Sequence, residues 1–409
     1  FILLLSISTF FTIINRKNQK LPATIGILLL GMLLSISVLG FKLISPDSYG
    51  KIPHILRHIN FHDFLMNIIL GFLLFAGALH INMKALEKEK WSVFLLAIFG
   101  TALSTLFIGF ASFYVFQAIS FEIPLLYCLL FGSLISPTDP IAVLSIFKNY
   151  DIDKSLSIKI EGESLFNDGI GIVFFLTILS IIQADGQNFN FTTTALLFAR
   201  EAIGGIFFGW LIGMIAKVVL KQTQEDAKTA VMVTLVLVMG GWAVADFIKV
   251  SAALAMVTAG ITVGQWIHHQ SPKALKDLVF TFWDIMDEIF NNTLFVLMGL
   301  AIILIDPNVI SFKLAFIAIA IVLFGRLVSV SLPVILLNIK KKSQGKENLK
   351  LISILTWSGL RGALAFALAL SLQDMPYGHT IIFLTYSVAA FSIIVQGLSV
   401  GKLLKHFGY

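Results

Sequence analysis

The chain has 409 residues, of which 57% are hydrophobic and only 13% are charged, and its formal net charge is +6. A soluble domain of this length needs charged residues to cover its surface, so the composition excludes one. Nucleic-acid binding is excluded too, because the basic residues are spread over short loops and not gathered in one patch. An intramolecular disulfide is impossible, because Cys128 is the only cysteine.

Apolar runs of about 20 residues recur along the whole chain, and each is long enough to cross a hydrocarbon layer of about 30 Å. Hydropathy therefore predicts an all-α polytopic membrane protein with a single membrane domain over residues 1–409. Residue 1 is Phe and not Met, so we expect the natural N-terminus to be trimmed. The thirteen predicted spans are residues 1–15, 21–44, 63–82, 91–117, 124–147, 157–183, 194–217, 228–248, 251–266, 278–304, 312–338, 350–371 and 379–401.

The basic residues test this count independently. Of the 29 Lys and Arg, 21 fall in loops after odd-numbered spans or at the C-terminus, 5 fall in loops after even-numbered spans, and 3 lie inside spans. The positive-inside rule assigns the basic loops to the cytoplasm, where they face anionic lipid. We therefore expect a protein of the cell (inner) membrane with its N-terminus outside and its C-terminus in the cytoplasm.

The fifth predicted span contains the sequence SPTDPIAV, in which Pro137 and Pro140 flank Thr138 and Asp139. Each proline removes a backbone donor, so the pair is predicted to unwind the helix. Unwound backbone at membrane depth is tolerated only beside a cavity or inside protein. The freed carbonyls, that of Thr138 included, and the Asp139 carboxylate then form an oxygen-rich pocket. The alternative interpretation is a structural proline kink.

The sixth predicted span carries four polar residues on one face. Glu163 and Asn167 lie one helical turn apart, as do Ser164 and Asp168, and together they form a polar wedge about 140° wide. Asp168 is about 16 Å from the cytoplasmic end of its helix, which places it near the midplane. Helix capping explains an acid only in a first turn, so it does not explain Asp168. The alternative is an acid that a neighbouring Arg neutralises for packing alone.

The eleventh and twelfth predicted spans carry Arg326 and Arg361. Arginine stays charged at any accessible pH, so both residues require buried anions, and the acids of the sixth span are the expected partners. Gly359 and Gly362 weaken the helix around Arg361. We expect both arginines to neutralise acids and join helices, and not to bind the transported ion.

The fifth and twelfth spans are thus the two that are both broken and charged. With the seventh span as linker, each is the fifth helix of a six-helix half, and the halves have opposite topology. Paired interrupted helices in an inverted repeat point to a transporter site at the midplane. No sequence identity between the halves is visible, so this prediction rests on position and topology. His54, His58 and His62 precede the third span at helical spacing; an incidental arrangement is favoured over a metal site or a pH sensor, and their role stays open.

Such a pocket suits a hard monovalent cation. Na⁺ prefers oxygen ligands, and Asp168, Asp139, Ser164 and the Thr138 carbonyl supply them. Removal from water disfavours the empty, charged carboxylate of Asp168, so it takes up either H⁺ or Na⁺. If only the loaded states cross the membrane, exchange follows without ATP. The sequence contains no phosphate-binding glycine loop, so we expect a secondary transporter, not an enzyme, with no cofactor.

Four motifs closely resemble those of the cation–proton antiporters of the NhaP/NHE type: SPTDPIAV at 136–143, GESLFNDG at 162–169, FGR at 324–326 and GLRGALAFAL at 359–368. This resemblance implies ion binding at Asp139 and Asp168, with the Thr138 carbonyl, Ser164 and Glu163 nearby. It also implies that Asn167, Arg326 and Arg361 hold the broken helices in place.

The resemblance further implies a homodimer that works by alternating access. Helices of residues 1–82 and 228–304 would form the dimerising scaffold, residues 91–183 and 312–405 the ion-translocating core, and residues 194–217 the linking helix. An Asn-Asp pair, where a related electrogenic branch has Asp-Asp, implies electroneutral one-for-one exchange.

Three alternatives remain beside Na⁺/H⁺ exchange. Exchange of K⁺ for H⁺ is the alternative within the family, and the sequence does not separate Na⁺, Li⁺ and K⁺ or give the direction and pH set-point. An intramembrane aspartyl protease also needs two membrane Asp residues, but in a YD plus GxGD pattern, whereas this chain has TDP and FNDG. A cation channel would normally build its filter by symmetry around a pore.

Overall fold

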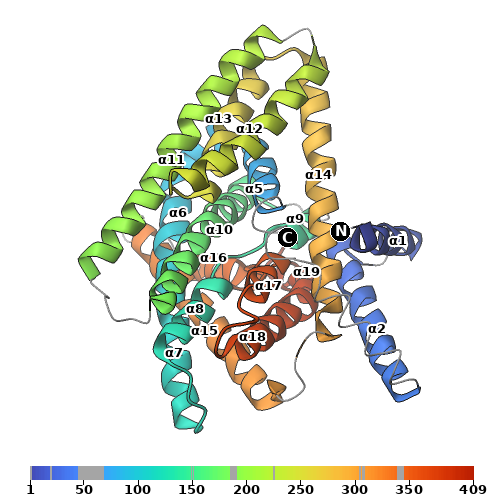
Figure 1. Cartoon of the computed structure of the whole chain (residues 1–409), viewed down its shortest axis with the longest axis vertical. Helices are drawn as coiled ribbons and strands as arrows, with labels where there is room; N and C mark the ends of the chain where they lie inside the picture. The colour runs from blue at the N-terminus through green and yellow to red at the C-terminus, as the bar shows by residue number, and fades with distance from the viewer. Residues whose placement is uncertain are drawn as a thin grey trace. The chain divides into compact units, whose positions relative to one another are not determined.

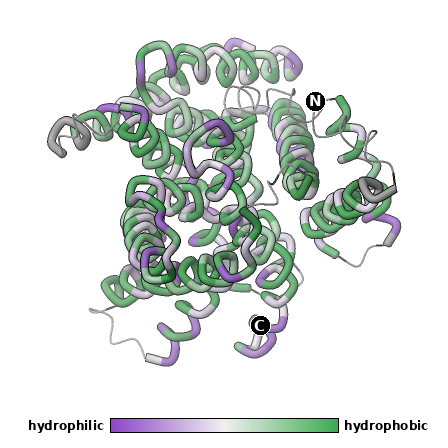
Figure 2. Tube along the Cα trace, turned by 60° about the horizontal axis from the view of Figure 1, so that its bottom comes forward, coloured by the Kyte–Doolittle hydropathy of each residue, from purple (hydrophilic) through white to green (hydrophobic). Residues whose placement is uncertain are grey.

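The computed structural model describes the chain apart from residues 1, 19–20, 45–68, 149, 151, 185–190, 224–225, 304, 306–308 and 339–344. Over the described residues the secondary structure is helical and contains no β-strand. Figure 2 shows hydrophobic residues along most of the helices and hydrophilic residues mainly at helix ends and in loops. The all-α membrane fold expected from the composition is therefore confirmed. His54, His58 and His62 lie outside the described residues.

Helices follow the predicted spans along the chain (Figure 1). The fifth and twelfth predicted spans each consist of two short helices separated by non-helical residues. In chain order the helices are α1 (Ile2–Asn18), α2 (Ala23–Ile44), α5 (Leu70–Leu79), α6 (Met83–Phe94), α7 (Thr101–Ala118), α8 (Leu125–Ile135), α9 (Ile141–Phe147), α10 (Lys154–Gln183), α11 (Phe191–Gln222), α12 (Ala227–Phe247), α13 (Ala252–Gln270), α14 (Lys273–Leu300), α15 (Phe312–Asn338), α16 (Gly345–Trp357), α17 (Ala363–Leu370), α18 (Gly378–Phe391) and α19 (Gly397–His406).

Eight helical segments of the described part are long and apolar enough to cross a membrane. The broken spans fall below that length, because α8, α9, α16 and α17 have only 11, 7, 13 and 8 residues. The number thirteen therefore stays a prediction, and the breaks explain only why the fifth and twelfth predicted spans are not among these eight segments.

In the described part of the chain, two long helices are each interrupted by a π-helical turn, a local widening that is frequent at functional sites. One turn, η2 (Leu95–Gly100), joins α6 to α7, and the other, η5 (Ser392–Gln396), joins α18 to α19. The first of these helices begins at Met83, earlier than the predicted 91–117, because the Asn82 side chain caps it by accepting the Ala85 N–H at 3.2 Å. Its first turns contain Lys and Glu, which form helices well but lower the hydropathy.

The chain divides into two compact units, which are described separately. Unit 1 consists of Phe1–His62, Phe99–Ile160 and Asn291–Tyr409, and unit 2 of Asp63–Ile98 and Glu161–Phe290. These units are defined by contacts, so they do not test which helices move. The division into scaffold and mobile core accordingly stays a prediction.

In unit 1, α8 packs against α7, α17 and α18, and α15 packs against α7, α16 and α18. Small residues allow the close approach of α7 and α8. A Cβ on Gly132 of α8 would lie only 3.2 Å from the Gly109 nitrogen of α7. Without a hydrophobic driving force in lipid, such tight packing is a main source of helix association. The two broken spans are therefore embedded in closely packed helices.

A second close approach in unit 1 joins α2 to the end of α14. A Cβ on Gly31 would lie 2.9 Å from the Gly299 Cα, and the Ser35 hydroxyl donates a hydrogen bond to the Gly299 carbonyl at 2.8 Å. Ser35 is fully buried there, so the bond satisfies a hydroxyl that has no access to water.

In unit 2, α13 packs against α5, α11 and α12. A Cβ on Gly260 of α13 would lie 2.8 Å from the Phe75 carbonyl oxygen of α5. Two glycines of α10 let neighbouring helices come close to it. A Cβ on Gly162 would lie 3.0 Å from Val93 of α6, and one on Gly169 would lie 2.7 Å from Leu254 of α13. These contacts fix α10, which carries the polar wedge, against two other helices of its unit.

Candidate functional site

The first break separates α8 from α9 and covers residues 136–140, as the two prolines predict. Pro140 is the N-cap residue of α9, and the Asp139 Oδ1 accepts the Ile141 N–H at 2.9 Å. The carboxylate of Asp139 therefore occupies the start of a helix, where unsatisfied N–H groups favour negative charge. Thr138 beside it is buried.

The second break separates α16 from α17 and covers residues 358–362. Its residues lie deep inside the protein, with Ser358, Leu360 and Arg361 all at most 3% exposed. Gly362 is the N-cap of α17, and no side chain caps that helix. Nothing in this segment removes a backbone donor as proline does, so its non-helical shape has to be held by neighbouring groups.

The two breaks bind each other directly within unit 1. The Asp139 N–H donates to the Leu360 carbonyl at 2.8 Å. The Arg361 guanidinium, through Nη1, donates to the carbonyls of Ser136 and, at 3.1 Å, of Pro137. A Cβ on Gly362 would lie 2.7 Å from the Asp139 Oδ2, so glycine is required at this crossing.

The positive charges at the crossing lie beside the carbonyl ends of helices, which carry partial negative charge. Helices α8 and α16 end at the breaks, and their last carbonyls carry partial negative charge. Arg361 donates to carbonyls just after α8, and Arg326 of α15 donates to the Leu355 carbonyl in the last turn of α16 at 3.1 Å. The sequence predicted that buried anions would neutralise both arginines. The hydrogen bonds described in unit 1 go to carbonyls at helix ends, and pairing with the acids of α10 stays a prediction.

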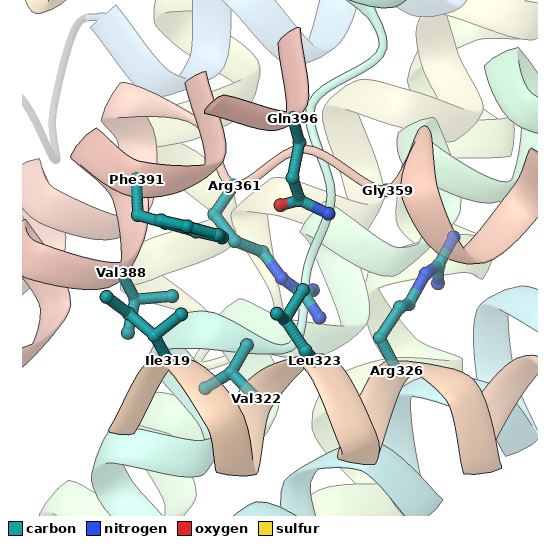
Figure 3. Close-up of a pocket in the computed structure, with 9 residues that line it drawn as sticks. All are labelled: Ile319, Val322, Leu323, Arg326, Gly359, Arg361, Val388, Phe391 and Gln396. Carbon is teal, nitrogen blue, oxygen red and sulfur yellow. The ribbon is translucent and has the colours of Figure 1, made fainter. Parts of the chain in front are cut away.

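Arg326 also explains one glycine of the second break. A Cβ on Gly359 would collide with the Arg326 Nε, so only glycine leaves room for the guanidinium there. Figure 3 shows Arg326 reaching toward the loop that carries Gly359, while the Arg361 guanidinium lies near Leu323 and the Gln396 amide. These residues line a cavity of about 10 Å³. A volume of this size holds about one water molecule.

The polar wedge of the sixth span lies on α10 in unit 2. Glu163, Ser164 and Asn167 are each 1% exposed, and Asp168 is partly exposed. Asp168 falls at the middle of the 30-residue helix, as far as possible from the ends where capping would explain an acid. The predicted positions of these four residues in one unbroken helix are confirmed. That Asp168 and Asp139 share one site stays a prediction, because they belong to different units.

Sequence reasoning missed the residues of the last span that contact the second break. Ser392 and Gln396 of η5 are buried and bond to the backbone of Arg361 in that break and of Trp357 just before it. Neither residue is ionisable and neither belongs to one of the four motifs. A buried Gln in an apolar span nevertheless needs hydrogen-bond partners, so Gln396 was the feature of the sequence that could have indicated this contact.

A multi-pass helical membrane protein with two broken, oppositely charged and mutually bonded helices has the architecture of a secondary transporter. The model of the family described as sodium/hydrogen exchanger, transmembrane, matches residues 3–406, and the chain belongs to that family. It is 39% identical to the Na⁺/H⁺ antiporter NhaP of Pseudomonas aeruginosa over 403 residues, which are 98% of this chain and 95% of that one.

Other relatives agree with this assignment. The chain is 33% identical to the Na⁺/H⁺ antiporter NhaH of Halobacillus dabanensis, with all of this chain and 97% of that one aligned. Its fold matches the solved structure of the sodium proton antiporter MjNhaP1 from Methanocaldococcus jannaschii with a TM-score of 0.76 and 22% identity, over 100% of this chain and 97% of that one. The resemblance drawn from the four motifs is therefore confirmed.

Proposed function

We propose that this chain is a secondary-active Na⁺/H⁺ antiporter that exchanges the two ions one for one by alternating access. The observation that supports this most is the crossing of the two breaks, where Asp139 N bonds to the Leu360 carbonyl and Arg361 bonds to the carbonyls of Ser136 and Pro137. The relatives from Pseudomonas aeruginosa and Halobacillus dabanensis are Na⁺/H⁺ antiporters by name, which agrees with this proposal.

The crossing gives the site its electrostatics. Arg361 and Arg326 supply fixed positive charge to the carbonyl ends of α8 and α16, so those carbonyls do not need water. The Asp139 carboxylate satisfies the N-terminal end of α9. Backbone that would otherwise have to be solvated thus stays unwound in a low-dielectric region.

In this proposal Asp168 is the shared seat for cation and proton. The Asp139 carboxylate, the Thr138 carbonyl and the Ser164 hydroxyl complete the oxygen ligands of Na⁺, with Glu163 and Asn167 supporting them. A carboxylate removed from water is stabilised by either ion, so the two compete for it. The empty, charged state crosses poorly, and the two loaded states therefore carry ions in opposite directions.

The remaining parts of the proposal concern assembly. The protein is a homodimer in the cell (inner) membrane with its N-terminus outside. Residues 1–82 and 228–304 form the dimerising scaffold, and residues 91–183 and 312–405 form the ion-translocating core. Its substrates are monovalent cations and protons, with no cofactor, and lipid surrounds it. Exchange of K⁺ in place of Na⁺ is the alternative that the experiment separates.

The experiment is recovery of a ΔpH-sensitive dye in everted membrane vesicles after separate additions of Na⁺, Li⁺ and K⁺. We expect Na⁺ to dissipate the gradient, with an apparent KM that rises up to about tenfold per pH unit on acidification, because protons compete. Recovery with K⁺ alone would replace Na⁺ by K⁺ in the proposal. No response to any of the three cations would overturn it.

The Asp168→Asn variant tests the assignment of the seat. It keeps the shape and one oxygen but cannot alternate between charge states, so we expect exchange to fall by more than about a hundredfold. Asp246→Asn is the matched control, because Asp246 is an exposed residue of the same unit. Its activity should stay within about twofold of the parent. Exchange retained by Asp168→Asn, with normal elution in detergent, would move the seat elsewhere.

A further inference from the structure

The last helical segment of the chain contains two buried polar residues that neither the motifs nor the proposed ion ligands include. Ser392 and Gln396, the first and last residues of the π-helical turn η5, are 1% and 3% exposed. A hydroxyl and a primary amide buried in an apolar helix cost free energy unless they are hydrogen-bonded. Their partners therefore indicate what the turn does.

The two side chains bond to the backbone of the second break, at Arg361, and of Trp357, the residue just before it. The Arg361 N–H donates to the Ser392 Oγ at 3.0 Å, and the Ser392 hydroxyl donates to the Gln396 Oε1. The Gln396 Nε2 donates to the carbonyl of Trp357, the last residue of α16, at 3.3 Å. One continuous chain of hydrogen bonds thus spans the break from its start to Arg361.

The indole of Trp357 adds a further bond between the same two segments. Its Nε1 donates to the Ser399 Oγ of α19 at 2.8 Å. The start of the break is therefore attached to the last span through both its backbone and its side chain. This pairing matters because the break contains glycines and no proline, so its shape is not fixed by the local sequence.

The held segment is the one that contacts Asp139. The Leu360 carbonyl, one residue before Arg361, accepts the Asp139 N–H at 2.8 Å. The Arg361 side chain reaches the Ser136 and Pro137 carbonyls beside Thr138. The path from Gln396 to Asp139 therefore runs through Ser392, the backbone of residues 360–361 and the bond from the Asp139 N–H to the Leu360 carbonyl.

From this geometry we propose that Gln396 and Ser392 are positioning residues for cation binding, which they support by holding residues 357–361 in register with Asp139. The proposal rests on the proposed antiport function. Na⁺ needs several oxygens at fixed distances, whereas a proton needs a single carboxylate oxygen. A shift of the break therefore weakens Na⁺ binding more than proton binding.

Removing the amide also changes the cavity beside it. Gln396 lines the cavity of about 10 Å³ next to Arg326 and Arg361. The Gln396→Met change keeps most of the volume and removes both hydrogen bonds, so it separates their loss from a packing defect. Ser392→Ala removes the link to the Arg361 N–H, and Ser392→Thr restores a hydroxyl.

The test measures Na⁺-dependent exchange of the full chain in proteoliposomes across a pH series. We expect Gln396→Met and Ser392→Ala to raise the apparent KM for Na⁺ about tenfold or more, with a maximal rate within about threefold, because each removes two buried hydrogen bonds that together are worth at least about one factor of ten. The pH profile measured at saturating Na⁺ should change little. Ser392→Thr should recover a KM within about threefold of the parent.

Ser387→Ala is the matched control, because Ser387 lies in α18 of the same segment and its hydroxyl bonds only to the Phe383 carbonyl of its own helix. It should leave the KM unchanged. Elution in detergent is measured for every variant, and Ser392→Ala, which removes one oxygen atom, serves as the test if Gln396→Met aggregates.

Each outcome decides one question. An unchanged KM in the folded variants, or a fall in maximal rate with the KM unchanged, overturns the positioning role while antiport stands. An equal rise of KM in Ser387→Ala overturns it as well, because the effect would then not depend on the break. A parent protein that shows no cation-dependent exchange overturns the proposed function itself.

Discussion

The two breaks of unit 1 look alike in outline but are held by different means. The break between α8 and α9 contains Pro137 and Pro140, and its own Asp139 carboxylate accepts the first N–H of the helix that follows. The break between α16 and α17 contains glycines, and side chains from α15 and η5 supply its bonds. The first is determined mainly by its local sequence and the second mainly by tertiary contacts.

This difference teaches where each break is vulnerable. Proline removes a backbone donor whatever surrounds it, so several local determinants reinforce one another in the first break. Glycine only permits a non-helical shape, so the second break depends on every group that holds it. Single changes around the second break should therefore have larger effects than single changes within the first. Three substitutions test that ranking.

The largest effect is expected for Arg361→Ala. This change removes the side chain that joins the breaks and leaves buried carbonyls of Ser136 and Pro137 without their donor. Exchange should fall by more than about a hundredfold, because breaking a buried charged network costs about 3–5 kcal/mol. Arg361→Lys keeps the charge but not the planar fork, so it should recover only part of the activity. Vesicle exchange measures both, and an Ala variant within threefold of the parent would contradict the joining role.

A moderate effect is expected for Gly362→Ala. The added Cβ would lie 2.7 Å from the Cβ and Oδ2 of Asp139, so the carboxylate has to move. Overpacking of this kind costs about 1–3 kcal/mol, and the apparent KM for Na⁺ should rise about tenfold.

Gly345→Ala is the control for that substitution, since a Cβ there would meet no atom of the described residues within 4 Å. It lies at the start of α16, where Ala should leave exchange unchanged and raise thermal stability slightly. Equal KM values for both glycine variants would show that the crossing tolerates a methyl group and that the close approach is not functional.

The smallest effect is expected for Pro140→Ala, in the break that its own sequence determines. Pro137 remains, as do the bond from the Ile141 N–H to the Asp139 carboxylate and the bond from the Asp139 N–H to Leu360. The KM and the midpoint of thermal unfolding should both stay close to the parent, with exchange changed less than about threefold. A loss as large as that of Arg361→Ala would mean that the local determinants do not reinforce one another, and the ranking of the two breaks would be reversed.

The sequence alone determined most of the fold and the identity of the polar positions. Hydropathy located the helices, two prolines located the first break, and helical periodicity placed Glu163, Ser164, Asn167 and Asp168 on one helix. These features depend on backbone donors, side-chain volume and residue spacing, which are local properties. The same is true of the four motifs that identified the family.

Only the tertiary structure decided which groups hold the crossing. Arg361 and Ser136 are 225 residues apart, and no local rule indicates that a guanidinium will bond to a carbonyl at the end of a distant helix. The sequence indicated that Arg361 needs a negatively charged partner. The carbonyl end of a helix carries partial negative charge and can take that place instead of a carboxylate. Ser392 and Gln396 were not predicted as site residues for the same reason. The role of a neutral polar side chain depends on the hydrogen-bond partner that folding places beside it.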